Sequence, residues 1–349
     1  MKRYGYLYEK VYEMENLKLA HKNAKKGKNH YKEVQRIDSD PDLYLYSLSE
    51  SLKNKTFRNS KYEIITKETD SGKIRDIYKL PYYPDRIVHH AILQVIGNIW
   101  YNSLIRDTYS SIKGRGIHDG VKRVKKALTD RENTVYCLKL DVRKYYQSID
   151  NEILKKIIRK KIKDKNLLWL LDEIIDSTNG VPIGNYLSQY FGNIYLSEVD
   201  HFCKQNVKYY FRYCDDIVIL HKDKTFLHSF YRKLESRIND LKLEVKGNWQ
   251  VFPVDKRGID FLGYRFFHDY VLLRKRIAKN LKKSVKRIRA KHTKMTTSSI
   301  INSVMSYYGW FKYANCKNLQ NSILDDDMCH IIKHRCLDDK IKNPLRKVS

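Results

Sequence analysis

Three aspartates stand where apolar segments end, and their positions could support metal-assisted chemistry. Asp141 closes the apolar run TVYCLKLDV, and Asp215 and Asp216 lie between two later apolar runs. Carboxylates from separate strands can hold two divalent cations about 4 Å apart, which align the attacking and leaving oxygens of a phosphoryl transfer. An Asp-Asp pair alone indicates only a hairpin turn. The aspartate on a separate strand makes magnesium-dependent chemistry on a polyanion the better interpretation.

The charge of the chain indicates a polyanionic partner. Its 349 residues include 69 lysines and arginines against 40 aspartates and glutamates, a formal net charge of +29. A free globular protein has little reason to carry this self-repulsion, so nucleic acid is the first candidate. A membrane surface is less favoured, because no stretch approaches the roughly 18 to 20 consecutive apolar residues that span a bilayer.

The cysteines favour a reducing, cytoplasmic compartment. The six of them are scattered without a CxxC pair, which argues against a disulfide framework and a zinc ribbon. The start of the chain also lacks the apolar core of a signal peptide. One metal site stays open, formed by neighbouring residues near the end of the chain: Cys329, His330, His334 and Cys336.

Hydrophobic spacing predicts the elements that must position the aspartates. The first 60 residues are mostly helical, and residues 62–86 contain a hairpin that turns at 69–72. Strands end at Asp141 and flank Asp215. Short strands are expected near Leu243 and Val251 and over FLGYRFF. Further helices are predicted over residues 87–104, 121–128, 151–176 and 226–241.

The last part of the chain is strongly basic. Between Asp269 and Asp325 it has no acidic residue, and eleven lysines and arginines fall within 274–294. Apolar residues recur there at helical spacing, which predicts an amphipathic helix with a basic exposed face. A solvated face normally mixes charge signs, so contact with nucleic acid is favoured. The candidates are Lys279, Lys282, Lys283, Lys286 and Arg287.

Several blocks together resemble reverse transcriptases. FRYCDDIVIL is similar to their YxDD motif, and YCLKLDVRKYYQSID to their block with the first catalytic aspartate. GKIRDI, SSIKGRGIHDG, VPIGNYLSQ, LKLEVKGN and FLGY follow the family's order over roughly residues 60 to 265. The resemblance implies an α+β right-hand polymerase, with fingers, a palm built on an antiparallel sheet, and a helical thumb. The expected boundaries are 1–130 for the N-terminal segment and fingers, 131–265 for the palm with a helical fingers-side insertion at about 151–180, and 266–349 for the thumb.

The resemblance also assigns the metal site. Asp141, Asp215 and Asp216 match the metal-binding carboxylates, with Asp216 the most replaceable. The Val142 carbonyl would complete a shell for two Mg²⁺ ions, with Mn²⁺ as a substitute. Lys246 matches the lysine that protonates the pyrophosphate leaving group, although Lys242 is close by in sequence.

Other matched positions would bind the nucleotide and the template. Lys73 and Arg75 match fingers residues that hold the incoming triphosphate. Tyr146 matches the aromatic residue that selects deoxynucleotides, with Tyr145 as the alternative. Arg115, between two glycines, would approach template phosphates.

One departure from the common pattern points to a subgroup. Most reverse transcriptases carry Gln-Gly and Ser-Pro in the block before YxDD, whereas this chain has Ile183-Gly184 and Ser188-Gln189. This resembles the enzymes of diversity-generating retroelements, which copy a template RNA into cDNA with errors at adenines. Ile183 offers no polar group to the incoming nucleotide, which predicts low fidelity.

The implied partners are dNTPs, template RNA, the RNA/DNA hybrid and a small basic helical accessory protein, for which a pentamer is one option. Two other interpretations stay open. One is an antiphage or abortive-infection reverse transcriptase, and the other is a non-catalytic RNA-binding protein with the hand fold.

Overall fold

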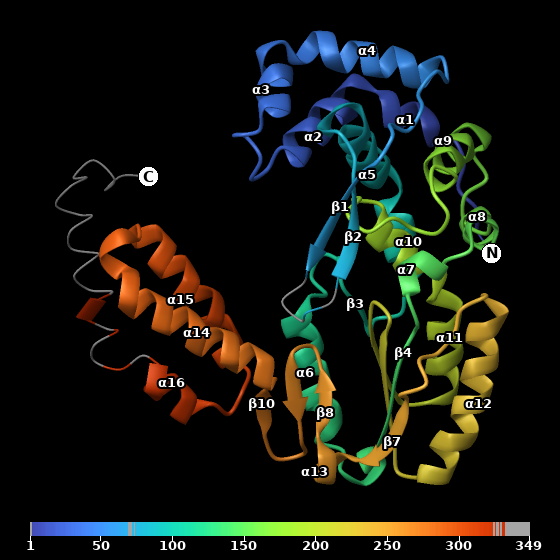
Figure 1. Cartoon of the computed structure of the whole chain (residues 1–349). Helices are drawn as coiled ribbons and strands as arrows, with labels where there is room; N and C mark the ends of the chain where they lie inside the picture. Colours follow the sequence, from blue (N-terminus) through green and yellow to red (C-terminus); the bar gives the residue numbers. More distant parts are fainter. Residues whose placement is uncertain are drawn as a thin grey trace. The chain divides into compact units, whose positions relative to one another are not determined.

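The computed structural model describes residues 2–68, 72, 74–323, 325, 328, 330 and 331 (Figure 1). The chain divides into two compact units. The first comprises Met1–Gly116, Leu138–Ile219 and Thr225–Gln250, and the second comprises Ile117–Cys137, Leu220–Lys224 and Val251–Ser349. This division into two units does not test the three expected lobes. Their boundaries near residues 130 and 265 stay a prediction.

The N-terminal part of the first unit is helical, as predicted. It contains α1 (Tyr8–Tyr12), α2 (Met14–Ala24), α3 (Lys32–Ser39) and α4 (Pro41–Lys53). Helix α5 (Ile87–Tyr101) follows the π-helical turn η1 (Tyr82–Arg86) and contacts α1 and α2. Residues 87–93 of this helix are all buried, so its first two turns are covered on every side rather than on one face.

The predicted hairpin is confirmed. Strands β1 (Glu63–Glu68) and β2 (Ile74–Lys79) pair antiparallel, with Glu68 opposite Ile74. Of its turn the structure describes only Gly72, whose φ of +72° suits a residue without a Cβ.

A five-stranded sheet carries the aspartates. Its strand order is β3 (Thr108–Tyr109), β5 (Tyr209–Tyr213), β6 (Asp216–His221), β4 (Tyr136–Asp141) and β7 (Gln250–Pro253). Two residues connect the neighbours β5 and β6, which therefore run antiparallel, since parallel strands need a long crossover. The short β3 adds a parallel pairing to β5.

Helices follow the sheet strands in the chain. These are α7 (Tyr145–Ser148), α10 (Ser188–Tyr195), α11 (Ser197–Asn206) and α12 (Lys224–Asp240). Helix α11 contacts β5, and its Phe202 stacks on Phe230 of α12 at a centroid distance of 5.7 Å.

The single helix expected over residues 151–176 is wrong, because the chain forms α8 (Asn151–Arg159) and α9 (Lys165–Ile175). The N-terminal segment of the chain pairs with the residues between α8 and α9. Tyr4 bridges Ile162, and its backbone N–H donates to the Lys161 carbonyl at 2.8 Å. Asp164 then caps α9 by accepting from the backbone of Leu167, and also accepts from Leu7 at 2.6 Å. Tertiary pairing thus outweighs the local helical pattern.

The second unit contains the predicted thumb helix. Helix α14 (Lys275–Lys291) buries Leu281, Val285 and Ile288. The five candidate cations Lys279, Lys282, Lys283, Lys286 and Arg287 are all exposed, so the amphipathic pattern is confirmed. The unit also holds α6 (Ile117–Leu128), η2 (Glu132–Thr134), α13 (Val254–Arg257), η3 (His292–Lys294), α15 (Thr297–Phe311) and α16 (Lys317–Ile323).

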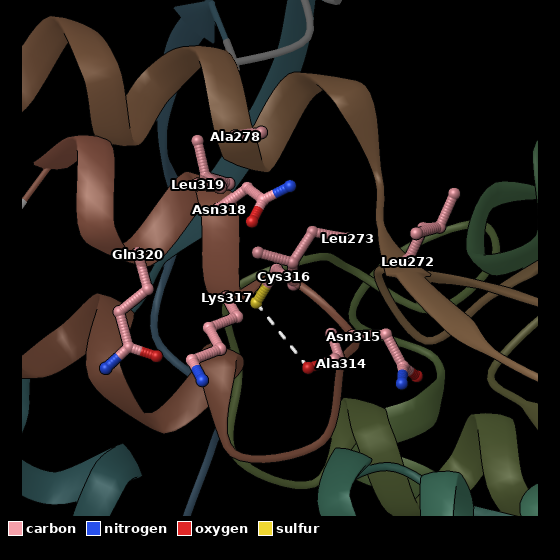
Figure 2. Close-up of a pocket in the computed structure, with 10 residues that line it drawn as sticks. All are labelled: Leu272, Leu273, Ala278, Ala314, Asn315, Cys316, Lys317, Asn318, Leu319 and Gln320. Atoms are coloured by element: carbon pink, nitrogen blue, oxygen red, sulfur yellow. Dashed lines mark hydrogen bonds between the residues drawn. The ribbon is translucent and has the colours of Figure 1, made fainter.

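A small antiparallel sheet leads into α14. Short strands form around FLGYRFF as expected, namely β8 (Ile259–Phe261) and β9 (Tyr264–Phe266), and β10 (Val271–Leu273) pairs with β9. Leu262 and Gly263 have φ of 54° and 85°, which turns the chain between the strands. A cavity of about 690 Å³ lies beside β10, α14 and α16. Figure 2 shows the residues that line it, among them Cys316, whose thiol donates to the Ala314 carbonyl.

A fully buried ion pair joins α11 to β5. The Arg212 guanidinium donates to both Asp200 oxygens at 2.6 Å, and both side chains are wholly inaccessible to solvent. Thr108 and Tyr210 donate to the same carboxylate. Burial alone would lower the pKa of Arg212, but the facing Asp200 carboxylate raises the pKa by more than burial lowers it. The net shift is therefore upward, and the arginine stays charged. The remaining guanidinium donors reach the carbonyls of Asn193 and Cys214.

Replacing Asp200 should destabilise the protein strongly. Asp200→Ala leaves the Arg212 charge buried without a counter-ion, which costs about 3 to 5 kcal/mol in the free energy of unfolding. Asp172→Ala is the matched control, because Asp172 pairs with Arg159 where both side chains are partly exposed; it should cost less than about 1 kcal/mol. Denaturant unfolding measures both. Equal losses in the two variants would contradict this account.

Candidate active site

The turn between β5 and β6 presents Asp215 beside the end of β4. Cys214 has a φ of 55°, an uncommon conformation for a residue with a side chain. Its carbonyl accepts from Arg212 at 2.9 Å, and the next carbonyl, that of Asp215, accepts from the Val142 N–H at 3.2 Å. The turn is therefore held from the protein interior and from the neighbouring strand.

A second connection brings Lys246 to the same place. Val142 bridges Val245, and the Lys246 N–H donates to the Asp141 carbonyl at 2.8 Å. The Lys246 ammonium lies 3.8 Å from an Asp141 carboxylate oxygen and 3.8 Å from one of Asp215. All three side chains are 33% exposed. The structure thus brings together three of the predicted site residues. Lys242, the sequence alternative, instead pairs with Asp150 at 2.6 Å.

The electrostatics of this cluster suit a bound cation. Burial raises the pKa of Asp215, and the Asp141 charge raises it further, against the lowering effects of Lys246 and Arg75. A divalent cation would relieve the repulsion between the two carboxylates. Around the Val142–Val245 bridge, the carbonyls of Asp141 and Glu244 accept backbone hydrogen bonds. The Val142 carbonyl, which was predicted as a metal ligand, accepts neither of these two bonds.

Asp216 lies in a different environment. It forms an ion pair with Lys139 of β4. Among the described residues, no group of three or more His, Cys, Asp or Glu side chains could hold a metal ion. Two carboxylates still fit Mg²⁺, which usually keeps waters and binds through one or two carboxylates plus substrate phosphates.

Of the terminal Cys/His set only His330 is described; Cys329, His334 and Cys336 lie outside the described residues.

The two adjacent tyrosines have different surroundings. Tyr145 is buried, and its hydroxyl donates to the Gly192 carbonyl. Tyr146 is half-buried, and its hydroxyl donates to Gln189 Oε1 at 2.8 Å. A Cβ at Gly192 would lie 2.9 Å from the Tyr146 ring, so the glycine makes room for it. Tyr146 is therefore the tyrosine with a surface to offer a substrate.

The loop with Ile183 and Gly184 packs against β2. The Ile183 carbonyl accepts from the Tyr78 N–H at 2.8 Å. A Cβ on Gly184 would lie 2.7 Å from the Tyr78 carbonyl, at a φ of +127° that side chains rarely adopt. Close approach therefore requires this glycine. Arg75 of β2 is exposed and lowers the pKa of Asp215, whereas Lys73 lies outside the described residues.

Arg115 has contacts inside the protein. It is only 8% exposed, donates to the Ile105 carbonyl at 2.7 Å, and covers the Tyr101 ring at 4.2 Å. These contacts hold most of the side chain inside the protein, and its role at template phosphates stays a prediction.

Sequence reasoning missed the residues that support the site. Four residues that hold the Cys214–Asp215 turn and Tyr146 were assigned no role: Asp200, Arg212, Gln189 and Gly192. An arginine within the apolar run YYFRY was the available signal, because a charge there needs a partner.

Comparison with known proteins identifies the family. The family model for reverse transcriptase (RNA-dependent DNA polymerase) matches residues 65–266, more than half of the chain. The chain belongs to the reverse transcriptase family. The match covers most of the hairpin, both aspartate-bearing strand ends and Lys246, and the predicted right-hand polymerase fold is confirmed for this chain.

The relatives include bacterial proteins. "Protein YkfC" of Escherichia coli (strain K12) is 27% identical over 233 residues, which covers 63% of this chain and 54% of that protein. "Retron Ec83 reverse transcriptase" of Escherichia coli is 27% identical over 141 residues, 36% of this chain and 43% of the relative. The chain thus spans about half the length of these curated relatives. The apo telomerase of Candida tropicalis aligns with a TM-score of 0.47 and 13% identity over 87% of this chain and 72% of that one.

Removing one carboxylate should weaken cation binding. Asp141→Asn and Asp215→Asn each keep the side-chain shape but remove a charge, so Mn²⁺ affinity should fall at least about tenfold. Calorimetric titration of Mn²⁺ measures this, with Asp172→Asn as the control for loss of an acidic residue elsewhere. Unchanged affinity in both site variants would show that the cation binds somewhere else.

Proposed function

We propose that this chain is an RNA-directed DNA polymerase that copies a template RNA into cDNA with dNTPs. One observation carries the proposal, namely that the Asp141 and Asp215 carboxylates meet at the Lys246 ammonium. These two aspartates and the Val142 carbonyl would hold two Mg²⁺ ions, with Mn²⁺ as a substitute. Bound there, the ions would neutralise charge on the attacking and leaving oxygens. Asp216, paired with Lys139, would assist as the more replaceable carboxylate.

The surrounding side chains would position the nucleotide. Lys246 lies near both aspartates, where it would donate a proton to the pyrophosphate leaving group. Arg75, and Lys73 by the family resemblance, would bind the triphosphate. Tyr146, kept in place by its bond to Gln189, would exclude a 2'-hydroxyl. Gly184, which has no Cβ to meet the Tyr78 carbonyl, lets the Ile183–Gly184 loop lie against β2, the strand that carries Arg75.

The thumb and the compartment complete the proposal. The exposed face of α14, with Lys279, Lys282, Lys283, Lys286 and Arg287, would contact template RNA and the RNA/DNA hybrid through phosphates. We propose a cytoplasmic enzyme that works with a small basic helical accessory protein. Among the described residues, no helix is long and apolar enough to cross a membrane.

Loss of one metal-binding carboxylate should abolish polymerisation without abolishing RNA binding. Asp215→Asn should lower dNTP incorporation on a primed RNA template at least about a hundredfold, because charge stabilisation is the main catalytic device. Filter binding of the same template should change little, and Asp172→Asn should keep full activity. Near-normal turnover in Asp215→Asn would remove this cluster from the reaction.

We further propose that synthesis is error-prone at template adenines, as in the diversity-generating group. Ile183 is half-buried next to β2, where its backbone carbonyl accepts from the Tyr78 N–H. Its side chain cannot supply the polar contact that a glutamine would give to a correctly paired nucleotide. An antiphage or abortive-infection role is the alternative, since the same site would serve it and one relative is a retron reverse transcriptase.

Restoring a polar group at this position should raise fidelity. Ile183→Gln should reduce misincorporation opposite adenine about tenfold or more, because discrimination by polar contacts is worth about 1 to 3 kcal/mol. Ile183→Leu keeps an apolar side chain and should leave the error rate unchanged. Sequencing of cDNA from the three proteins makes the comparison. Equal error rates for wild type and Ile183→Gln would locate the cause of low fidelity elsewhere.

A further inference from the structure

A lysine stands inside the apolar strand that ends at Asp141. Strand β4 buries Cys137, Leu138 and Leu140, whereas Lys139 and Asp141 are half-buried. Side chains two residues apart in a strand point to the same face, so Lys139 lies on the face of β4 that presents Asp141. The Lys139 side chain is only 18% exposed. A lysine so far withdrawn from water needs an acidic partner.

Asp216 on the neighbouring strand β6 is that partner. Its side chain is 23% exposed and forms an ion pair with the Lys139 ammonium. Apart from this pair, no hydrogen-bond donor of the described residues reaches Asp216 Oδ1, an atom that is closed to solvent. The Lys139 charge therefore compensates this oxygen. Without Lys139, the carboxylate would be left partly buried and unpaired, and would turn to another cation.

The other two aspartates of the cluster are held differently. Asp141 and Asp215 share one ammonium group, that of Lys246, which lies 3.8 Å from an oxygen of each. Within these five side chains, three carboxylates meet two ammonium groups, so one negative charge remains for a cation. A site with so little charge of its own suits Mg²⁺, which keeps waters and takes substrate phosphates as further ligands.

We propose that Lys139 is a positioning residue that holds Asp216 back from the cation site and thereby makes the site selective for Mg²⁺ over Ca²⁺. The inference rests on the proposed function, because it concerns the same cation site. Mg²⁺ needs few protein oxygens, whereas Ca²⁺ takes about six to eight oxygen ligands and gains from an added carboxylate. Asp216 directly follows Asp215 in the chain, so a released Asp216 would add its oxygens to the same site.

The test measures ion preference in the free protein, without nucleic acid or dNTPs. Mg²⁺ and Ca²⁺ each displace bound Mn²⁺, and the electron paramagnetic resonance signal of free Mn²⁺ gives the two affinities. Lys139→Met keeps an unbranched side chain but frees Asp216, so the ratio of Ca²⁺ affinity to Mg²⁺ affinity should rise at least about fivefold. Loss of one positive charge acts alike on two divalent cations, so the ratio isolates the added ligand.

Three further variants control this result. Asp216→Asn in the Lys139→Met background should return the ratio to the wild-type value, because the added carboxylate is gone. Lys139→Arg keeps a charge opposite Asp216 and should retain the wild-type ratio. Lys155→Met is the matched control, since Lys155 is similarly buried, at 13% exposure, but pairs with Glu152 and Asp176. It should leave the ratio unchanged, and thermal unfolding checks that every variant is folded.

A folded Lys139→Met variant with the wild-type ratio, or a rise that persists after Asp216→Asn, would overturn the proposal. The single variant Asp216→Asn gives a test that does not depend on Lys139→Met folding. It should keep the wild-type ratio, and a clear fall would show that Asp216 already holds the cation, which overturns the proposal as well.

The same variants separate this inference from the polymerase proposal. If dNTP incorporation depends on Asp215 but Lys139→Met leaves the ratio unchanged, the polymerase stands and the role of Lys139 is overturned. If the ratio rises in Lys139→Met and returns with Asp216→Asn in a protein that never incorporates dNTPs, the role of Lys139 is supported and the polymerase proposal is contradicted.

Discussion

The buried Asp200–Arg212 ion pair is the constraint on which the geometry of the active site depends. One guanidinium group binds the α11 carboxylate and also donates to the Asn193 carbonyl in α10 and the Cys214 carbonyl in the turn between β5 and β6. The Asp200 carboxylate in turn accepts from Thr108 of β3 and Tyr210 of β5. Two helices, two strands and the turn therefore share one set of hydrogen bonds. Removing either charge would leave the other one buried and unpaired.

The position of Asp215 follows from that constraint. With the Cys214 carbonyl fixed by Arg212, the turn adopts an uncommon left-handed conformation and places the Asp215 carbonyl against the Val142 N–H. The Asp141 carbonyl is fixed by the Lys246 N–H on the other side. Backbone bonds rather than flexible side chains thus set the separation of the two carboxylates. A site built on rigid elements suits a reaction in which positioning and charge stabilisation supply most of the catalysis.

Local patterns in the sequence were enough to predict the strand ends with their aspartates, the β1–β2 hairpin and the amphipathic helix α14. In each case the signal is short-range, either a period of apolar residues or a polar residue at the end of a strand. The main error arises where distant segments meet, because Tyr4 bridges Ile162 inside the helix expected over 151–176. The hairpin within FLGYRFF is local, and its turn at Leu262 and Gly263 was not foreseen.

The supporting residues were missed for the same reason. Asp200 looks like an ordinary acidic residue early in a helix, and nothing local shows that it faces Arg212. Arg115 sits between glycines, which predicts an approach to template phosphates, and nothing local shows that its side chain also contacts Tyr101 and the Ile105 carbonyl. Family resemblance located the carboxylates. Only the tertiary structure shows what holds them in place.

The single-turnover rate of dNTP incorporation by Arg212→Lys tests this account most directly. Lysine keeps the charge opposite Asp200, but one ammonium cannot replace the fork that also reaches the Cys214 carbonyl. The account predicts a folded protein with wild-type affinity for a primed RNA template and a rate at least about tenfold lower. A folded Arg212→Lys variant with the wild-type rate would contradict it.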